Sequence, residues 1–242
     1  MPGSVTRSLD FHTPVSATLN AIAAMAIAPT CAACAAVLER PLDGPICAAC
    51  WSAVTPLALS WHPAGGSCLS EVVAAGVYDG ALRDIIHAWK FERRRSIGPR
   101  LAALTRERAG GALDGADIAV PVPMTPWRTW RRGFNQADDL ARGLGLPVRR
   151  PLGRWRPRPP QSSLPSSRRR SNMAGAIWLM PCAGRAVRGR VVVLVDDVMT
   201  TGATLEACAA RLHEAGAKEV RAITAARAVM RSARPAGSAR AR

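Results

Sequence analysis

Two adjacent carboxylates, Asp196 and Asp197, directly follow the apolar run VVVLV at residues 191–195. Such a run of valine and leucine is typical of a strand that is buried on both faces of a parallel sheet. Ligands of α/β proteins bind at the carboxyl ends of these strands. Because the chain leaves the strand here, both carboxylates can bend toward one ligand. Carboxylates suit the two hydroxyl groups of a ribose, and they help to attract Mg²⁺ that carries a diphosphate.

A short segment rich in hydroxyl groups follows the acidic pair and enters a predicted helix at 203–215. Exposed N–H groups at a helix start, a glycine that permits close backbone approach and three hydroxyl groups favour the binding of a phosphate dianion. The alternative is a structural Asp pair with a threonine that only caps the helix. The ordered combination of strand, acidic pair and loop favours the phosphate site. Its predicted residues are Thr200, Thr201, Gly202, Ala203 and Thr204.

Two CxxC pairs near the N-terminus predict a metal site. Cys31 and Cys34 form the first pair, and Cys47 and Cys50 form the second, with twelve residues between the pairs. Two such pairs complete a tetrahedral shell of four thiolates, which is typical of structural Zn²⁺ with no open coordination position. Two disulfides, a redox pair or a copy that has lost its metal are the alternatives, but a cytosolic chain keeps its thiols reduced. The other cysteines are predicted to be core thiols: Cys68, Cys182 and Cys208.

The composition limits the class of protein. The chain has 242 residues, of which 48% are hydrophobic, so it can build a real core. Its net charge is +16, almost entirely from arginine, and arginine side chains bind phosphates. A compositional arginine bias with solvated charge runs is the alternative to nucleic-acid binding. Aromatic residues make up only 5%, which argues against a stacking platform for single-stranded nucleic acid.

No apolar run reaches the roughly 18 residues that a membrane span requires. Residues 17–28 weakly resemble a signal peptide, but Asp10 and His12 lie close before them and Asn20 interrupts them. We therefore expect a short amphipathic helix at 16–28 and a cytoplasmic protein.

From Glu71 onward, short apolar runs alternate with helical patterns, which is typical of an α/β domain. After a turn at Asp79, Leu82, Ile85, Ile86 and Trp89 predict one buried helical face. Residues 124–136 are expected to be a basic loop, and residues 153–172 a mobile one. Further helices are predicted at 98–109 and 137–144, and strands at 71–78, 117–122, 146–152, 174–180, 191–195 and 219–226.

These patterns divide the chain into five parts. The small parts are an N-terminal helix at 1–29, a four-cysteine zinc-binding module at 30–55 and a linker at 56–70. The main domain spans 71–230, and a basic disordered tail follows at 231–242.

Residues 192–204 resemble the phosphoribosyl diphosphate signature of type I phosphoribosyltransferases, which have a Rossmann-like α/β fold with a mainly parallel sheet. The resemblance implies that Asp196 and Asp197 hold the ribose hydroxyls at the catalytic centre and that residues 200–204 hold the 5′-phosphate. Residues 30–228 also resemble the competence-associated ComF family. The matching motifs occur in order: CAAC with CAACW, YDGALRDIIHAWKF, VPVP, RRGFNQA, QSSLPSSRRRSNMAGAI and the diphosphate signature.

Other residues of these motifs are predicted to contact the same ligand. Pro121 and Val122 would stiffen a loop against the diphosphate. Lys90 suits a phosphate contact, although a lysine that extends along the surface is the alternative. The remaining predicted ligand-binding residues are Arg132, Asn135, Gln136, Gln161, Arg169 and Asn172.

Two classes of function fit these features. The first is an enzyme in which Mg²⁺–diphosphate leaves ribose C1 while a nucleophile attacks the opposite face, with Asp197 as a candidate base. No base-binding segment identifies the acceptor. The second is a non-catalytic module that senses the ligand, binds single-stranded DNA or docks on a competence helicase. The ComF resemblance implies this link to DNA uptake, with the zinc module as the docking surface.

Overall fold

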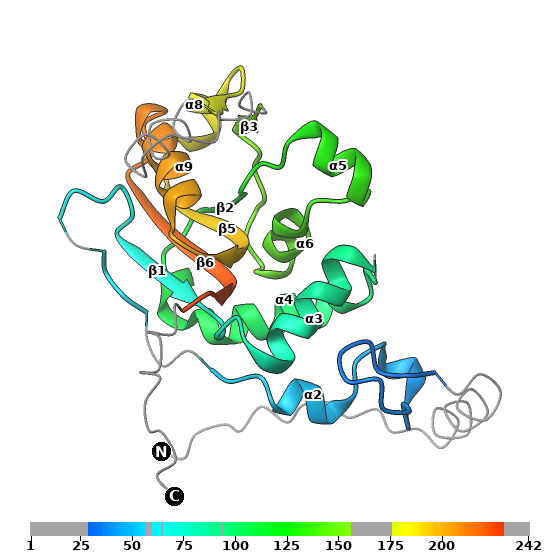
Figure 1. Cartoon of the computed structure of the whole chain (residues 1–242). Coiled ribbons are helices and arrows are strands. Elements are labelled where there is room, and N and C mark those ends of the chain that lie inside the picture. Colours follow the sequence, from blue (N-terminus) through cyan, green and yellow to red (C-terminus); the bar gives the residue numbers. More distant parts are fainter. Residues whose placement is uncertain (1–28, 57–59, 64, 93, 156–175, 230–242) are drawn as a thin grey trace, which may run out of the picture.

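The central sheet of the protein is fully parallel. The computed structural model describes residues 29–56, 60–63, 65–92, 94–155 and 176–229. Four strands pair in the order β1-β6-β5-β2 (Figure 1). They are β1 (Glu71–Ala74), β2 (Ile118–Pro121), β5 (Val191–Met199) and β6 (Glu219–Arg227). The expected α/β class with a mainly parallel sheet is therefore confirmed.

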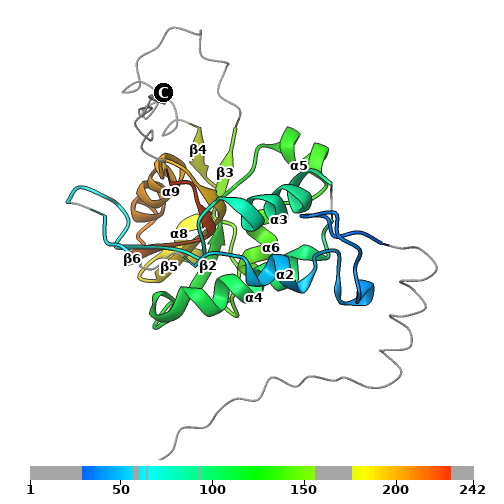
Figure 2. The ribbon, with the colours of Figure 1, turned by 60° about the horizontal axis from the view of Figure 1, so that its bottom comes forward.

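Helices cover both faces of this sheet, as Figure 2 shows. Successive side chains of a strand point to opposite faces, and β5 follows this period. Val193 and Val195 belong to one buried cluster, and Val192 and Leu194 belong to another. The first cluster contains α3 (Gly80–Phe91), α4 (Ile97–Ala109) and α6 (Gln136–Gly143). The second contains α8 (Ala183–Val187) and α9 (Ala203–Glu214).

Helix α3 forms as the sequence predicts. The side chain of Asp79 accepts a hydrogen bond from Gly80 N at 2.8 Å and so caps the helix. Leu82, Ile86 and Trp89 are at most 1% exposed, in agreement with the apolar spacing. The predicted helices at 98–109, 137–144 and 203–215 are also present, each shifted by at most one residue at an end.

The basic segment at 124–136 was expected to be a loop, and this expectation is wrong. A helix, α5 (Pro126–Arg132), forms inside it. Pro126 stands in the first turn, where its missing N–H costs no hydrogen bond. Gly133 ends the helix with φ 79°, a left-handed conformation that favours glycine.

Several strands are shorter than predicted. The strand expected at 71–78 ends at Ala74, because a tight turn follows. A Cβ added at Gly76 would lie 2.7 Å from a methyl group of Leu82. In the predicted strand at 146–152, Val148 makes only an isolated bridge to Ala119. A separate antiparallel pair follows, formed by β3 (Leu152–Arg154) and β4 (Ile177–Leu179).

Short elements complete the described chain. They are η1 (Pro41–Asp43), α2 (Ala48–Ser52) and η2 (Gly110–Leu113). None of the helices in the described ranges has the length and apolar composition that crossing a bilayer requires. The helix predicted at 16–28, most of the loop predicted at 153–172 and the tail at 231–242 lie outside the described residues.

Candidate functional site

The two carboxylates lie within strand β5, near its carboxyl end, rather than after it. The strand continues to Met199, with Asp196 paired to Thr224. The N–H of Asp197 donates a hydrogen bond to Asp196 Oδ1 at 2.8 Å. Both aspartates nevertheless line one cavity of about 220 Å³. The prediction that they face a common space is therefore consistent with the structure, although the strand does not end before them.

Lys90 forms an ion pair with this acidic pair. Its Nζ donates to Asp197 Oδ1 at 2.8 Å, and the side chains of Lys90 and Asp197 are 12% and 15% exposed. Lys90 stands in the last turn of α3, one residue after the buried Trp89. The alternative of a lysine extended along the surface is therefore wrong.

The cavity has an excess of positive charge. Among the residues that the structure describes, four cationic side chains line it, against the two carboxylates. Two of the cations were not predicted. Arg128 comes from α5, which lies in the segment predicted as a loop, and Arg154 ends β3. The proline and glycine that bound α5 are the sequence signal that would have placed Arg128 on a helix. The cations are Lys90, Arg128, Arg132 and Arg154.

The carboxyl group of Asp196 has a shifted pKa. Burial, and then the neighbouring charge of Asp197, raise its pKa from 3.8 to about 7. The hydrogen bond from Asp197 N and the positive charges of Lys90 and Arg154 oppose this rise without cancelling it. A carboxyl group with a pKa near neutrality can exchange a proton at physiological pH.

Arg132 and Gln136 form a hydrogen-bonded pair with unused donors. Arg132 Nη1 donates to Gln136 Oε1 at 3.2 Å, and its guanidinium lies 5.2 Å from the centroid of the Phe91 ring. Burial lowers the pKa of Arg132. Among the described residues, Arg132 Nε and Gln136 Nε2 are buried and have no hydrogen-bond partner. Because unpaired buried donors cost free energy, these two groups favour an anionic or carbonyl-bearing ligand.

Asn135 lines the cavity and also holds the loop after β2. Its side-chain amide donates to Val122 O at 3.1 Å, and its oxygen accepts from Ala137 N at the start of α6. The N–H of Val122 is already bonded to Val195 O. Val122 therefore shapes the cavity wall, and its N–H is not available to a ligand. Pro121 lines a neighbouring groove instead.

The predicted phosphate loop surrounds a second, smaller cavity of about 40 Å³ at the start of α9. Gly202 precedes the helix with φ 77°, and Ala203 N donates to Thr201 Oγ1 at 3.4 Å. The first N–H groups of a helix have no partner within the helix, so they are free to bind an anion. The residues of the loop that line this cavity are Thr200, Thr201, Gly202, Ala203 and Thr204.

Apart from Pro121 and residues 200–203 of the phosphate loop, the predicted ligand-binding residues fall into three groups. Lys90, Val122, Arg132, Asn135 and Thr204 line the larger cavity with the acidic pair. Gln136 lies behind Arg132, to which it is hydrogen-bonded. The structure does not describe three further residues: Gln161, Arg169 and Asn172.

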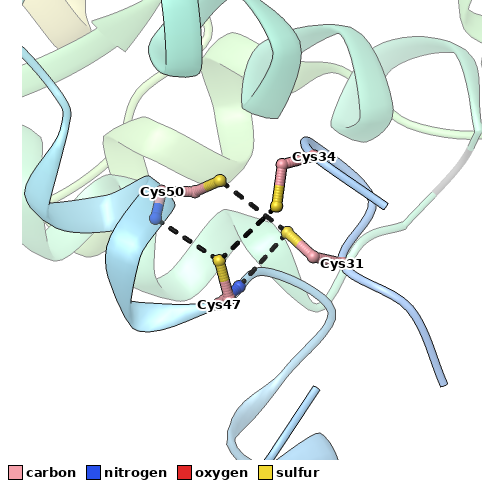
Figure 3. A group of neighbouring side chains, drawn as sticks. All are labelled: Cys31, Cys34, Cys47 and Cys50. Atoms are coloured by element: carbon pink, nitrogen blue, oxygen red, sulfur yellow. Dashed lines mark hydrogen bonds between the residues drawn. The ribbon is translucent and has the colours of Figure 1, made fainter. Parts of the chain in front are cut away.

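The four N-terminal cysteines form a second candidate site, shown in Figure 3. Their sulfur atoms all lie within 4.8 Å of one another. The distance from Cys31 Sγ to Cys50 Sγ is 3.9 Å, and that from Cys34 Sγ to Cys47 Sγ is 3.8 Å. Metal–sulfur bonds of about 2.3 Å in a tetrahedron place the sulfur atoms about 3.8 Å apart. A disulfide would bring them to about 2 Å. The geometry fits a tetrahedral metal ion, and no disulfide joins the four cysteines in this structure.

Backbone N–H groups favour the thiolate form at this site. Cys31 Sγ accepts hydrogen bonds from Ala33 N at 3.4 Å and Cys47 N at 3.3 Å. Burial alone would raise the pKa of Cys31, but these donors lower it to about 6. Because a metal binds the deprotonated thiolate, the environment of Cys31 suits metal binding. Burial and the neighbouring thiols raise the pKa of Cys50 in the same cluster.

The remaining cysteines differ from one another. Cys208 is fully buried in α9, and its predicted core role is confirmed. Cys68 is half-buried. Cys182 is exposed, with φ 64° at a turn, so its predicted core position is wrong.

Comparison with known proteins supports a phosphoribosyltransferase-type domain. The family model described as "Phosphoribosyl transferase domain" matches residues 130–239. Glutamine phosphoribosylpyrophosphate (PRPP) amidotransferase from B. subtilis shares 24% identity, with a TM-score of 0.34, over 52% of this chain and 26% of that chain. The parallel sheet and the family match together define the class.

Two curated relatives narrow the class. DNA utilization protein YhgH of Escherichia coli K12 is 33% identical in an alignment of 184 residues. The alignment covers 66% of this chain and 75% of the relative. Competence protein F of Haemophilus influenzae is 32% identical in an alignment of 179 residues. This alignment covers 67% of this chain and 78% of the relative. The chain belongs to the ComF family of competence-associated proteins with a phosphoribosyltransferase-like domain.

Asp196→Asn is expected to stabilise the ligand-free protein at about pH 8 and to have little effect at about pH 4. The raised pKa of Asp196 keeps a proton on the folded protein that the unfolded chain has already released. Wild-type stability therefore falls as pH rises from the ordinary value of 3.8 to about 7. Asparagine avoids this loss. The expected gain is on the order of 2 kcal/mol, about half of the full effect, because solvent screens the half-buried side chain. Urea unfolding at both pH values measures it, and a pH-independent difference would contradict the raised pKa.

The purified protein is expected to hold one divalent metal ion per chain, measured by elemental mass spectrometry. Cys31→Ser should remove most of the metal, because three thiolates leave the tetrahedral shell open. Cys182→Ser is the matched control, since Cys182 is exposed and lies outside the cluster. Equal metal content in both variants would show that the four cysteines are not the binding site.

Proposed function

We propose that the cavity at the end of β5 binds phosphoribosyl diphosphate together with Mg²⁺. The observation that supports this most strongly is that the two cavities adjoin. Asp196, Val198 and Thr204 line both of them. A ribose held by Asp196 and Asp197 would thus present its 5′-phosphate to residues 200–204. The carboxylates and the phosphate loop are then used by one ligand rather than two.

The remaining charges suit the diphosphate end of that ligand. Lys90, Arg128 and Arg132 line the larger cavity beside the acidic pair. The unpaired donor Arg132 Nε would gain a hydrogen bond from a phosphate oxygen. Bound Mg²⁺ would neutralise further charge on the diphosphate.

The same geometry supports transfer of the phosphoribosyl group to an acceptor. The bond between ribose C1 and the diphosphate oxygen would break, and the acceptor nucleophile would form the new bond on the opposite face. The cations stabilise the departing negative charge, while the phosphate loop fixes the position of the ribose. Asp196, whose pKa is raised to about 7, is a second candidate for the general base beside Asp197.

Single-stranded DNA is a second candidate ligand, and one surface favours it. The rings of Trp127 and Trp130 on α5 stack with centroids 4.9 Å apart, and they are 52% and 74% exposed. Arg128 and Arg131 stand beside them on the same exposed helix. Exposed rings stack on bases while arginine contacts phosphates. Aromatic residues are few in this chain, but Trp127 and Trp130 are exposed side by side, so the argument from composition against stacking is weak.

We propose Zn²⁺ as the ion of the four-cysteine site, because Zn²⁺ prefers a tetrahedral shell of four thiolates. Reduced thiols fit a cytoplasmic protein. The division into a zinc module at 30–55 and a phosphoribosyltransferase domain at 71–230 is part of the same proposal. Val37 and Leu42 are 63% and 59% exposed, and they would form the apolar contact with a protein partner such as a competence helicase.

Wild-type protein is expected to bind phosphoribosyl diphosphate in the presence of Mg²⁺ in a calorimetric titration. Asp196→Asn/Asp197→Asn should weaken binding by at least about tenfold, because hydrogen bonds to charged groups contribute about 1.5–3 kcal/mol. Asp114→Asn, an exposed aspartate outside the cavity, is the matched control. Equal affinities in all three proteins would contradict the proposed site. Pyrophosphate release across a panel of bases and amines then tests turnover.

Replacing Trp127 and Trp130 by alanine is expected to weaken binding of a single-stranded oligonucleotide by roughly 5- to 100-fold. Arg185→Ala, an exposed arginine on α8, should leave binding nearly unchanged. Fluorescence anisotropy at several salt concentrations measures both effects, since phosphate contacts must weaken as salt rises. Binding that is insensitive to salt, or absent, excludes this second function.

A further inference from the structure

The inner side of the four-cysteine centre is part of the core of the main domain. Cys31 and Cys50 are only 2% and 8% exposed. They belong to the same buried cluster as Ile85 and Trp89 of helix α3. Helix α2, which carries Cys50, lies directly beside α3 (Figure 2). The centre is therefore not an independent appendage.

A second connection joins the end of this module to the turn before α3. Thr55 O accepts a hydrogen bond from Val77 N at 3.4 Å. Arg108 bridges the two segments, because its guanidinium donates to Ala75 O at 2.7 Å and to Val54 O at 3.4 Å. The start of α3 is thus held by residues that follow the cysteine centre directly in sequence.

The other end of α3 carries the cation of the acidic pair. Lys90 stands in the last turn of this twelve-residue helix, which is about 18 Å long. A helix of this length moves as a rigid rod, so a shift at its packed face displaces Lys90. Lys90 and Lys218 are the only lysines of the chain. The 2.8 Å contact with Asp197 therefore depends on where α3 lies.

We propose that the four-cysteine metal centre is a positioning element for the ligand site: it fixes helix α3 and thereby holds Lys90 against Asp197. The centre does no chemistry itself and lies outside the cavity. Its consequence for ligand affinity rests on the proposed binding of phosphoribosyl diphosphate, whereas its effect on α3 does not. Loss of the metal would leave the folded sheet in place and loosen one cation of the site.

Amine labelling of the full chain tests the structural half. A water-soluble acylating reagent modifies exposed ε-amines, and Lys218 provides an exposed internal control. Removing the metal with a chelator is expected to increase labelling of Lys90 severalfold and to leave Lys218 unchanged. Hydrogen exchange should increase in residues 80–91 while residues 191–199 stay protected. Unchanged labelling of Lys90 would overturn the proposal. Equal loss of protection in β5 would also overturn it, because the centre would then be a general folding element.

A double-mutant cycle tests the functional half. Cys34→Ser removes the exposed ligand, and Lys90→Met removes the cation but keeps an unbranched side chain. Each is expected to weaken phosphoribosyl diphosphate binding about tenfold, as loss of a charged hydrogen bond does. In the Lys90→Met background, Cys34→Ser should cost less than about twofold, because coupled residues are not additive. Glu39→Gln, an exposed change in the same module, is the control for nonspecific damage.

The two halves separate the possible failures. Additive effects in the cycle would overturn the positioning role even if each variant binds weakly. If the wild type does not bind phosphoribosyl diphosphate at all, the proposed function fails. The labelling of Lys90 then still decides whether the metal centre fixes α3.

Discussion

The structure of the site depends on one electrostatic constraint, the placement of two carboxylates side by side at a partly buried strand end. Like charges at this distance repel, and burial increases the cost of each. The protein responds in two ways. It brings cations from three separate elements, α3, α5 and β3, to the same cavity. It also shifts the pKa of Asp196 toward neutrality, so that the second negative charge is easily removed.

To keep these cations beside the two carboxylates, the helices that carry them must hold fixed positions. Trp89 is fully buried immediately before Lys90, so the packing of α3 also sets the position of the ammonium group. Asn135 caps α6 and holds the loop after β2 at the same time. Each of these contacts is structural by itself. Together they keep a concave, positively charged space open beside the acidic pair.

This member of the ComF family carries a phosphoribosyltransferase-like domain and a four-cysteine module in one chain. The two parts share a buried cluster rather than lying apart. A metal centre of this kind adds stability where a short segment cannot form a core by itself. In this protein, the core side of the four-cysteine cluster packs in the same buried cluster as α3, while Val37 and Leu42 of the same segment are exposed.

The sequence by itself determined the features that are encoded locally: the buried strand with its acidic pair, the glycine-containing loop before α9, the apolar face of α3 and the paired cysteines. Period, capping residues and short spacings carry these features. Only the tertiary structure decided that Lys90 pairs with Asp197, that Arg128 and Arg154 enter the cavity and that Cys182 is exposed. These outcomes depend on distances between elements far apart in the chain, which packing of the two sheet faces sets and no local pattern records.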